Sequence, residues 1–573
     1  MNMLNFYGKK LQNLCSSSYS KTSCFFQSTR FLITCFYRYF LFRINSFAFQ
    51  IFLFRFSFLF WVFLVLKSLN PRTEFRPRAL DFFFTSVSAT TVSSMSTVEM
   101  EVFSNSQLVV MTILMFLGGE VFTSMVGLHM KRSKIIKAWK SEGRVTSVDS
   151  DPPSPRPSDF LDQIELSIVT IPDLEVPRIE SQNDVLSSYN TNNPFIRYNS
   201  IKFLGFLVLG YLLVIQIIGI ASVLIYLALI SSANDVLRKK GLKTLTFAIF
   251  TVVSTFASCG FVPTNENMMV FSKNSGLLWI LIPQVLLGNT LFPSFLRFSI
   301  WVLGKKFKKA EANYLLKKTA EVKYLHLLPG MHSSFLVATV LGFIFIGLIL
   351  FCSMEWNSAA LSGLNTYQKL VGALFQSVNA RHTGETIVDI STIAPAILVF
   401  FVVMMLVSLP LSLSHSDYAL QFCEGANSSS YSSTFLHILH FYQLKGIHNA
   451  KYIAKRGRIK EELEKIFILS QLSYLMIFII LICITERKKI KEDPLNFSVL
   501  NITLEVISAY GNVGFTTGYS CDRQLKSDPT CVSKWYGFSG KWSDEGKVIL
   551  IIVMFFGRLK KFNMNGGQGW KLL

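Results

Sequence analysis

The sequence predicts an all-α polytopic membrane protein with about eight transmembrane helices and four re-entrant half-helices. Of its 573 residues, 51% are hydrophobic and 16% are charged, whereas soluble domains carry about 25% charged residues. Long apolar runs recur in pairs, and most are near the roughly 20 residues that a helix needs to cross a bilayer. Between the members of each pair lies a shorter helix-forming segment that ends in small residues.

The apolar runs form four pairs in chain order. They span roughly Ser46–Leu69 and Leu108–Met130, Phe203–Ser231 and Leu277–Leu303, Phe335–Cys352 and Ile393–Leu413, and Ile466–Ile484 and Val548–Phe556. The shorter segments between them are Asp81–Ala89, Thr244–Ala257, Tyr367–Val378 and Ser498–Tyr510. At about 1.5 Å per residue these segments reach halfway across a membrane. Each pair with its segment is therefore predicted to be one unit of spanning helix, re-entrant half-helix and spanning helix, repeated four times along the chain.

Basic residues set the predicted orientation of these units. Lys and Arg are dense after the second run of each pair, which places those ends and both termini in the cytoplasm. The predicted pore units are residues 46–130, 201–304, 335–414 and 464–558, and the predicted cytoplasmic segments are 1–45, 131–200, 305–334, 415–463 and 559–573. Some basic residues, among them Arg238–Lys240, fall on the outer side. The net charge of +21 does not indicate nucleic-acid binding, because the basic residues flank apolar spans.

Four short segments carry a small residue at an equivalent place, each after a predicted half-helix. They read SATTVSSMSTVEM, TFASCGFVPTNEN, QSVNARHTGETIV and SAYGNVGFTTGYS, and they bring Ser94, Gly260, Gly384 and Gly514 into register. Four re-entrant loops around one axis are what a cation filter made of backbone carbonyls needs. The pattern indicates ion permeation, with these four residues as the selectivity filter.

Ser94 is the filter position at which the four segments differ. Glycine adopts positive φ without a Cβ penalty, whereas other residues lose roughly 1–2 kcal/mol in the left-handed region. The Cβ and hydroxyl of Ser94 are expected to disturb the carbonyl ring in one quadrant. Because potassium sheds its water only to well-placed oxygens, this change is expected to disfavour potassium more than sodium.

Polar residues beside the filter are expected to form the outer pore mouth. The carboxylates of Glu99, Glu101, Glu266 and Glu385 would concentrate cations there, and Asn265 would add no charge. Arg381 precedes the third filter position, and we expect it to pair with a carboxylate of the pore region.

Three residues are predicted to act on the cytoplasmic side of the filter. Arg558 is expected to form a barrier to cation flow, partly balanced by Glu120, since charges within spans are functional suspects. Pro410 removes a helix hydrogen bond and is expected to break the second helix of the third unit as a gate.

The polar loop after the fourth filter segment carries two further candidate features. Cys521 and Cys531 share this loop, where a disulfide is plausible because the loop is predicted to lie outside the cell. Asn496, in the sequon NFS, is a candidate glycosylation site on the same side.

The most specific motifs are VSSMSTVEMEVFSNSQL, ASCGFVPTNENM, VNARHTGE and AYGNVGFTTGYSC. With the four pairs of runs, they resemble the plant high-affinity potassium transporter (HKT) family and its microbial Trk/Ktr relatives. The resemblance implies four units of membrane helix, pore helix and membrane helix (M1–P–M2), arranged with pseudo-fourfold symmetry around a central pore. The resemblance implies a plasma-membrane transporter of Na⁺, or of Na⁺ and K⁺, without a cofactor, in plant sodium homeostasis and salt tolerance. It also implies a homodimer in the lipid bilayer, and it associates Ser at the first filter position with sodium preference.

The function predicted from these features is passive, channel-type Na⁺ uniport. Sodium–potassium cotransport or potassium uptake remains the alternative within the same class. A carrier with inverted repeats would show broken spanning helices in two halves, and an enzyme would show motifs such as GxSxG, HExxH or a P-loop. The sequence contains none of these enzyme motifs, so an enzyme is not predicted.

Overall fold

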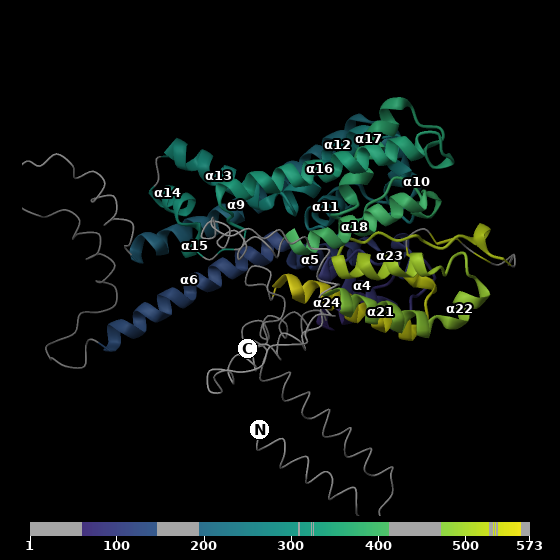
Figure 1. Ribbon diagram of the computed structural model, residues 1–573, viewed down its shortest axis with the longest axis horizontal. Coiled ribbons are helices and arrows are strands. Elements are labelled where there is room, and N and C mark those ends of the chain that lie inside the picture. Colours follow the sequence, from purple (N-terminus) through teal and green to yellow (C-terminus); the bar gives the residue numbers. More distant parts are fainter. Residues whose placement is uncertain are drawn as a thin grey trace, which may run out of the picture.

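The fold is helical throughout the part of the chain that the structure describes. That part of the computed structural model comprises residues 60–145, 194–307, 310–322, 324, 326–411, 471–525, 531, 533–534 and 537–562. Within these ranges the β-structure consists of one isolated antiparallel bridge, between Tyr519 and Lys534. The predicted all-α class is therefore confirmed, and Figure 1 shows the helices packed along one long axis.

Each unit contains a pore helix between longer helices. The first unit has a helical stretch at 60–68, α4 (Ala79–Thr91), α5 (Asn105–Gly118) and α6 (Glu120–Val145). The second has α9 (Pro194–Leu229), α10 (Ser231–Lys239), α11 (Thr244–Phe256), α12 (Ser275–Gly288) and α13 (Phe292–Phe307). The third has α16 (Gly330–Glu355), α17 (Thr366–Asn379) and α18 (Pro395–Leu411), and the fourth has α21 (Gln471–Thr485), α22 (Arg487–Glu492), α23 (Val499–Gly511) and α24 (Asp544–Phe562). The pore helices α4, α11, α17 and α23 begin and end within a few residues of the predicted half-helices.

The second helices of the first two units are broken, whereas the sequence pattern predicts continuous spans. The pair α5 and α6 bends by 55° at Gly119, and the pair α12 and α13 bends by 84° at residues 289–291. By length and hydropathy, α9 and α16 can each cross a membrane alone, and each bent pair qualifies as a further span. The breaks fall at Gly118–Gly119 and after Gly288, where glycine weakens a helix interior.

Two further segments differ from their predicted form. The predicted cytoplasmic loop at 305–334 contains the helices α14 (Ala310–Lys317) and α15 (Thr319–Val322). Helix α24 extends beyond the predicted run Val548–Phe556 at both ends. The run appears short because Lys547 and Arg558 interrupt it, although both side chains are buried. The predicted segments at 1–45 and 415–463 lie outside the described residues.

Buried apolar side chains from all four units form one core around the filter loops. Phe82, Phe250, Phe375 and Phe515 represent the four units in it. A second cluster joins α4 to α23 and α24, and a third packs α14 against α6 and α9. Figure 1 shows α10 and α22 at one end of the long axis and α13, α14 and α15 toward the other. The filter loops are therefore held within protein, where non-helical backbone is tolerated in a membrane.

The first and fourth units are also joined by ion pairs. Lys547 Nζ of α24 lies 2.9 Å from Asp81 Oδ1 of α4, and both side chains are buried. Arg78 donates to both carboxylate oxygens of Asp544, at 3.2 and 2.9 Å, on the surface nearby. The first and fourth units thus lie against each other and close a ring of four units.

Candidate functional site: the four-loop filter

Three of the four filter loops begin where a pore helix ends in a left-handed residue, whereas the third pore helix ends at Ala380 in the right-handed region. Val92, Ser258 and Asn512 have φ of 51°, 61° and 52°, and each stands two positions before a predicted filter residue. The amide of the next residue returns to the helix, as in Ser93 N to Ser88 O at 2.9 Å and Val513 N to Ser508 O at 3.0 Å. This closing bond ends each helix abruptly and turns the chain back.

The four predicted filter residues all have positive φ and line one pocket. Their φ angles are 55° for Ser94, 80° for Gly260, 70° for Gly384 and 98° for Gly514. All four line the same cavity, together with Thr264, Thr386 and Thr516 and neighbouring residues. Loops separated by more than a hundred residues in sequence therefore converge on one space.

The loops pack against one another in a circular order. A Cβ built on Gly260 would lie 1.8 Å from Thr383 O of the third loop, and one on Gly384 would lie 2.5 Å from Gly514 C of the fourth. A Cβ built on Gly514 would lie 2.2 Å from the Cβ of Ser94 in the first loop. The three glycine positions therefore have no room for a side chain. Ser94 alone of the four carries a Cβ and a hydroxyl, so the ring departs from four equivalent residues there.

Polar side chains join neighbouring loops behind the filter. Asn512 Nδ2 donates to Ser93 Oγ at 2.7 Å, between the fourth and first units. Thr255 Oγ1 donates to Glu385 Oε1 at 2.5 Å, between the second and third. Thr290, at the break between α12 and α13, lies 2.7 Å from His382 Nε2 of the third loop. These contacts hold the loops in fixed relative positions.

Glycines in the second helices allow the pore helices to approach closely. A Cβ on Gly118 would lie 2.4 Å from Thr90 O, one on Gly288 1.9 Å from Phe256 O, and one on Gly557 2.0 Å from Tyr510 O. In three units a glycine thus faces the carboxyl end of its own pore helix, which carries partial negative charge. These glycines were not among the residues predicted from the sequence, although each stands out in an apolar run.

The carboxylates predicted at the outer pore mouth are paired with lysines in the structure. Lys240 Nζ lies 2.7 Å from Glu101 Oε1 and 2.6 Å from Glu266 Oε2. Lys534 Nζ lies 3.6 Å from Glu99 Oε1. These lysines were not predicted from the sequence, because loops distant in sequence bring them to the carboxylates.

Asn265 ties these acidic residues together. Its backbone amide donates to Glu101 Oε1 at 3.1 Å, and its Oδ1 accepts from Glu101 N at 3.1 Å. Its Nδ2 donates to Glu99 Oε2 at 3.3 Å, and the residue lines the filter pocket. The burial of Lys240 acts to lower its pKa, but its hydrogen bonds and ion pairs with Glu101 and Glu266 outweigh burial and raise that pKa above the ordinary value. Lys240 is therefore charged at neutral pH.

The structure places Glu385 and Arg381 away from their predicted positions. Glu385 is fully buried and its carboxylate meets Thr255 of α11, so it stands behind the filter rather than at the mouth. Arg381 is 7% exposed, and its Nε and Nη1 have no hydrogen-bond partner among the described residues. The predicted ion pair of Arg381 with a pore-region carboxylate is absent from that part of the chain.

Arg558 and Glu120 meet at the break in the second helix of the first unit. The guanidinium of Arg558 is buried and donates from Nη2 to the carbonyl oxygen of Gly118. Its charge interacts with that of Glu120, the first residue of α6, and His326 Nε2 lies 3.8 Å from Glu120 Oε1. A residue of the fourth unit thus satisfies a carbonyl freed where α5 ends. Pro410, the predicted break in the second helix of the third unit, lies one residue before the end of α18 at Leu411. The chain after Leu411 lies outside the described residues.

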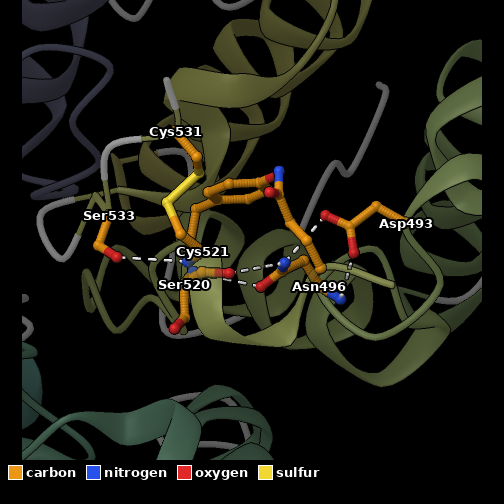
Figure 2. Close-up of a disulfide and its surroundings, with 8 residues drawn as sticks. Asp493, Asn496, Ser520, Cys521, Cys531 and Ser533 are labelled. Atoms are coloured by element: carbon orange, nitrogen blue, oxygen red, sulfur yellow. Dashed lines mark hydrogen bonds between the residues drawn. A yellow bond between two sulfur atoms is a disulfide. The ribbon is translucent and has the colours of Figure 1, made fainter. Parts of the chain in front are cut away.

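A disulfide joins Cys521 and Cys531 in the loop of the fourth unit. Figure 2 shows Asn496 beside this bridge, with its amide turned into the protein. Asn496 is 1% exposed, and its Nδ2 donates to Asp493 Oδ2 and to Ser520 O, both at 2.9 Å. The glycosylation prediction is therefore corrected, because a buried amide engaged in two hydrogen bonds has no room for a glycan.

The chain is similar in sequence to known membrane transporters. Sodium transporter HKT1 of Arabidopsis thaliana is 47% identical over 88% of this chain and 91% of its own. The probable cation transporter HKT1;4 of Oryza sativa subsp. japonica is 46% identical over 89% of this chain and 93% of its own. The crystal structure of the potassium transporter TrkH from Vibrio parahaemolyticus aligns with a TM-score of 0.41 and 14% identity, over 88% of this chain and 83% of that one.

The fold and the converging loops define a membrane cation transporter built from four pore units. A family model described as TrkH, cation transport protein, matches residues 165–564. The chain belongs to this family, and the resemblance to the HKT transporters is confirmed. Its relatives are transporters rather than enzymes.

Proposed function

We propose that this protein conducts Na⁺ passively, as a channel-type uniporter, across the plasma membrane. Ions pass between Ser94, Gly260, Gly384 and Gly514 as the selectivity filter. The observation that carries the proposal is the convergence of these residues, all at positive φ, on one pocket. A further support is that the 47% identical relative is named a sodium transporter.

The preference for Na⁺ over K⁺ rests on Ser94. Potassium loses its water only where a complete ring of oxygens replaces it. The glycine loops pack so tightly that an added Cβ would lie 1.8 to 2.5 Å from an atom of the neighbouring loop, whereas the first loop must accommodate a side chain. The quadrant of Ser94 therefore differs from the other three. The free-energy cost of this asymmetry falls on K⁺, because K⁺ depends more than Na⁺ on a symmetric ring of oxygens.

Sodium–potassium cotransport or potassium uptake is the alternative function. It is favoured by Gly260, Gly384 and Gly514, since three quadrants keep the residue that permits carbonyl coordination. The two functions differ in whether K⁺ moves the reversal potential.

Arg558 is assigned the role of a barrier to cations on the cytoplasmic side of the filter. Its buried cation stands at the break after Gly118 and is partly balanced by Glu120. The orientation follows from the basic residues after each second helix, which place both termini in the cytoplasm. A homodimer in the plasma membrane, and a role in plant sodium homeostasis under salt stress, complete the proposal.

Two-electrode voltage clamp of the expressed chain tests this function. Na⁺ and K⁺ are exchanged in the bath, and the parent is compared with Ser94→Gly. The proposal expects the parent's reversal potential to follow Na⁺ alone, and Ser94→Gly to admit K⁺. A parent that follows K⁺ equally well would replace Na⁺ uniport with the alternative.

A further inference from the structure

One cation of the protein itself occupies the acidic mouth of the filter. Lys240 follows the last residue of α10. Its Nζ lies 2.7 Å from Glu101 Oε1, 2.8 Å from Glu266 Oε1 and 2.6 Å from Glu266 Oε2. One ammonium therefore engages a carboxylate from the first unit and one from the second.

The two glutamates that bind this ammonium are next in sequence to residues that line the filter pocket. Glu101 follows Met100, and Glu266 follows Asn265, and both neighbours line the pocket. Glu101 and Asn265 are also joined by two reciprocal hydrogen bonds at 3.1 Å. The side chain of Lys240 is 21% exposed and that of Glu101 is 23% exposed, so solvent screens their charges only in part.

A pore mouth with three carboxylates would raise the local concentration of cations. The lysines at this mouth oppose that effect, Lys240 through Glu101 and Glu266 and Lys534 through Glu99. We propose that Lys240 is a resident counter-cation of the mouth, which sets the apparent affinity for Na⁺ by cancelling part of the attraction of Glu101 and Glu266. The inference rests on the proposed function, because it concerns the ions that enter the same filter.

Lys240 also has a bond that serves structure alone. Its carbonyl oxygen accepts from Arg72 Nη1 of the first unit at 3.2 Å. A substitution of the Lys240 side chain leaves this backbone bond in place. The test must nevertheless separate a change in charge from a loosening of the loops.

The test measures Na⁺ current against external Na⁺ concentration at low ionic strength. Lys240→Gln removes one positive charge, and the half-saturating Na⁺ concentration is expected to fall about threefold. Lys240→Arg keeps the charge and is expected to match the parent. Lys239→Gln is the matched control, because it also removes one positive charge. Lys239 is adjacent to Lys240 and exposed, and it forms no ion pair with any residue that the structure describes.

Two more variants carry the test in the opposite direction. Glu101→Gln removes one negative charge, so that Lys240 and Glu266 balance, and it is expected to raise the half-saturating concentration about threefold. Lys240→Gln combined with Glu101→Gln restores the parent's net charge and is expected to restore its half-saturating concentration. A purely structural role predicts instead that the double variant is impaired at least as much as either single one. All the shifts are expected to shrink as an impermeant salt raises the ionic strength to about 0.15 M, where charges are screened beyond roughly 8 Å.

The results that overturn the inference are separate from those that overturn the function. Suppose that the parent conducts Na⁺. If Lys240→Gln then has the same half-saturating Na⁺ concentration as the parent, or if this variant reaches the surface but carries no current, Lys240 is not a counter-cation. Unchanged half-saturation in Glu101→Gln would overturn the inference without any change to Lys240. If neither the parent nor any variant conducts Na⁺, the proposed function itself fails.

Discussion

The ion pair between Asp81 and Lys547 is expected to be essential for closing the ring of units. The two side chains are 7% and 2% exposed, and Nζ lies 2.9 Å from Oδ1. At an effective dielectric constant of about 20, charges this close attract by roughly 6 kcal/mol, and the cost of desolvation offsets much of that. Removing Asp81 is different, since it leaves the charge of Lys547 buried and unpaired, at a cost of about 3–5 kcal/mol. The reverse does not hold, because Asp81 also pairs with Arg78, whose Nε lies 3.3 Å from Oδ2.

Asp81→Asn is the perturbation that tests this reasoning. The detergent-solubilised protein is heated, and the fraction that remains monodisperse is followed by size-exclusion chromatography. The variant is expected to lose several kcal/mol of stability and to aggregate at a clearly lower temperature. Replacing both residues with apolar ones of similar size, Asp81→Leu with Lys547→Met, is expected to recover most of the loss, because no charge is then buried alone.

The neighbouring ion pair of Arg78 and Asp544 supplies the matched control. It joins the same two segments, but its side chains are 59% and 55% exposed. Asp544→Asn is therefore expected to cost at most about 1 kcal/mol. The burial argument is refuted if Asp81→Asn is as stable as the parent, or if Asp544→Asn is destabilised equally.

Three further outcomes are expected from the filter and its surroundings. Gly260→Ser should abolish the current while the protein still reaches the surface in normal amount, since its Cβ would lie 1.8 Å from a carbonyl oxygen of the third loop. Gly363→Ser is the control and should conduct, because Gly363 also has positive φ but has open space around it. Arg558→Gln should increase inward Na⁺ current and change rectification under voltage clamp, and unchanged current would exclude the barrier. Replacing Cys521 and Cys531 together with Ser should lower thermal stability by about 2–4 kcal/mol while leaving the reversal potential unchanged, and a shifted reversal potential would mean that the bridge also shapes the filter.

The pore helices could be predicted from sequence because their signals are local. The second half-helix was expected at Thr244–Ala257 and is found at Thr244–Phe256. Apolar runs bounded by small residues are sufficient for such a prediction. The register of the four filter positions was visible for the same reason, since each follows a pore helix by a nearly constant interval.

The breaks in the second helices depend on tertiary contacts and could not be predicted from hydropathy. The apolar pattern continues through Gly119, and a continuous span was expected there. What ends α5 is the approach of Gly118 to the carbonyl of Thr90, and what compensates the freed Gly118 carbonyl is Arg558 from the other end of the chain. Neither partner is near in sequence.

The charge of the mouth could not be predicted for a similar reason. Glu101 and Glu266 were predicted at the mouth because they follow filter residues, and their sequence neighbours Met100 and Asn265 line the filter pocket. Lys240 precedes Gly260 by twenty positions, and the turn after α10 returns it to the mouth. The carboxylates could be predicted from their closeness in sequence to the filter residues, but Lys240, which pairs with both of them, could not.

The most direct measurement is the bi-ionic reversal potential of the purified chain in a planar bilayer, with Na⁺ on one side and K⁺ on the other. The filter described here predicts a steady conductance whose reversal potential favours Na⁺, carried by this chain alone. Absence of conductance, or a reversal potential near zero, would contradict a sodium-selective path between Ser94, Gly260, Gly384 and Gly514.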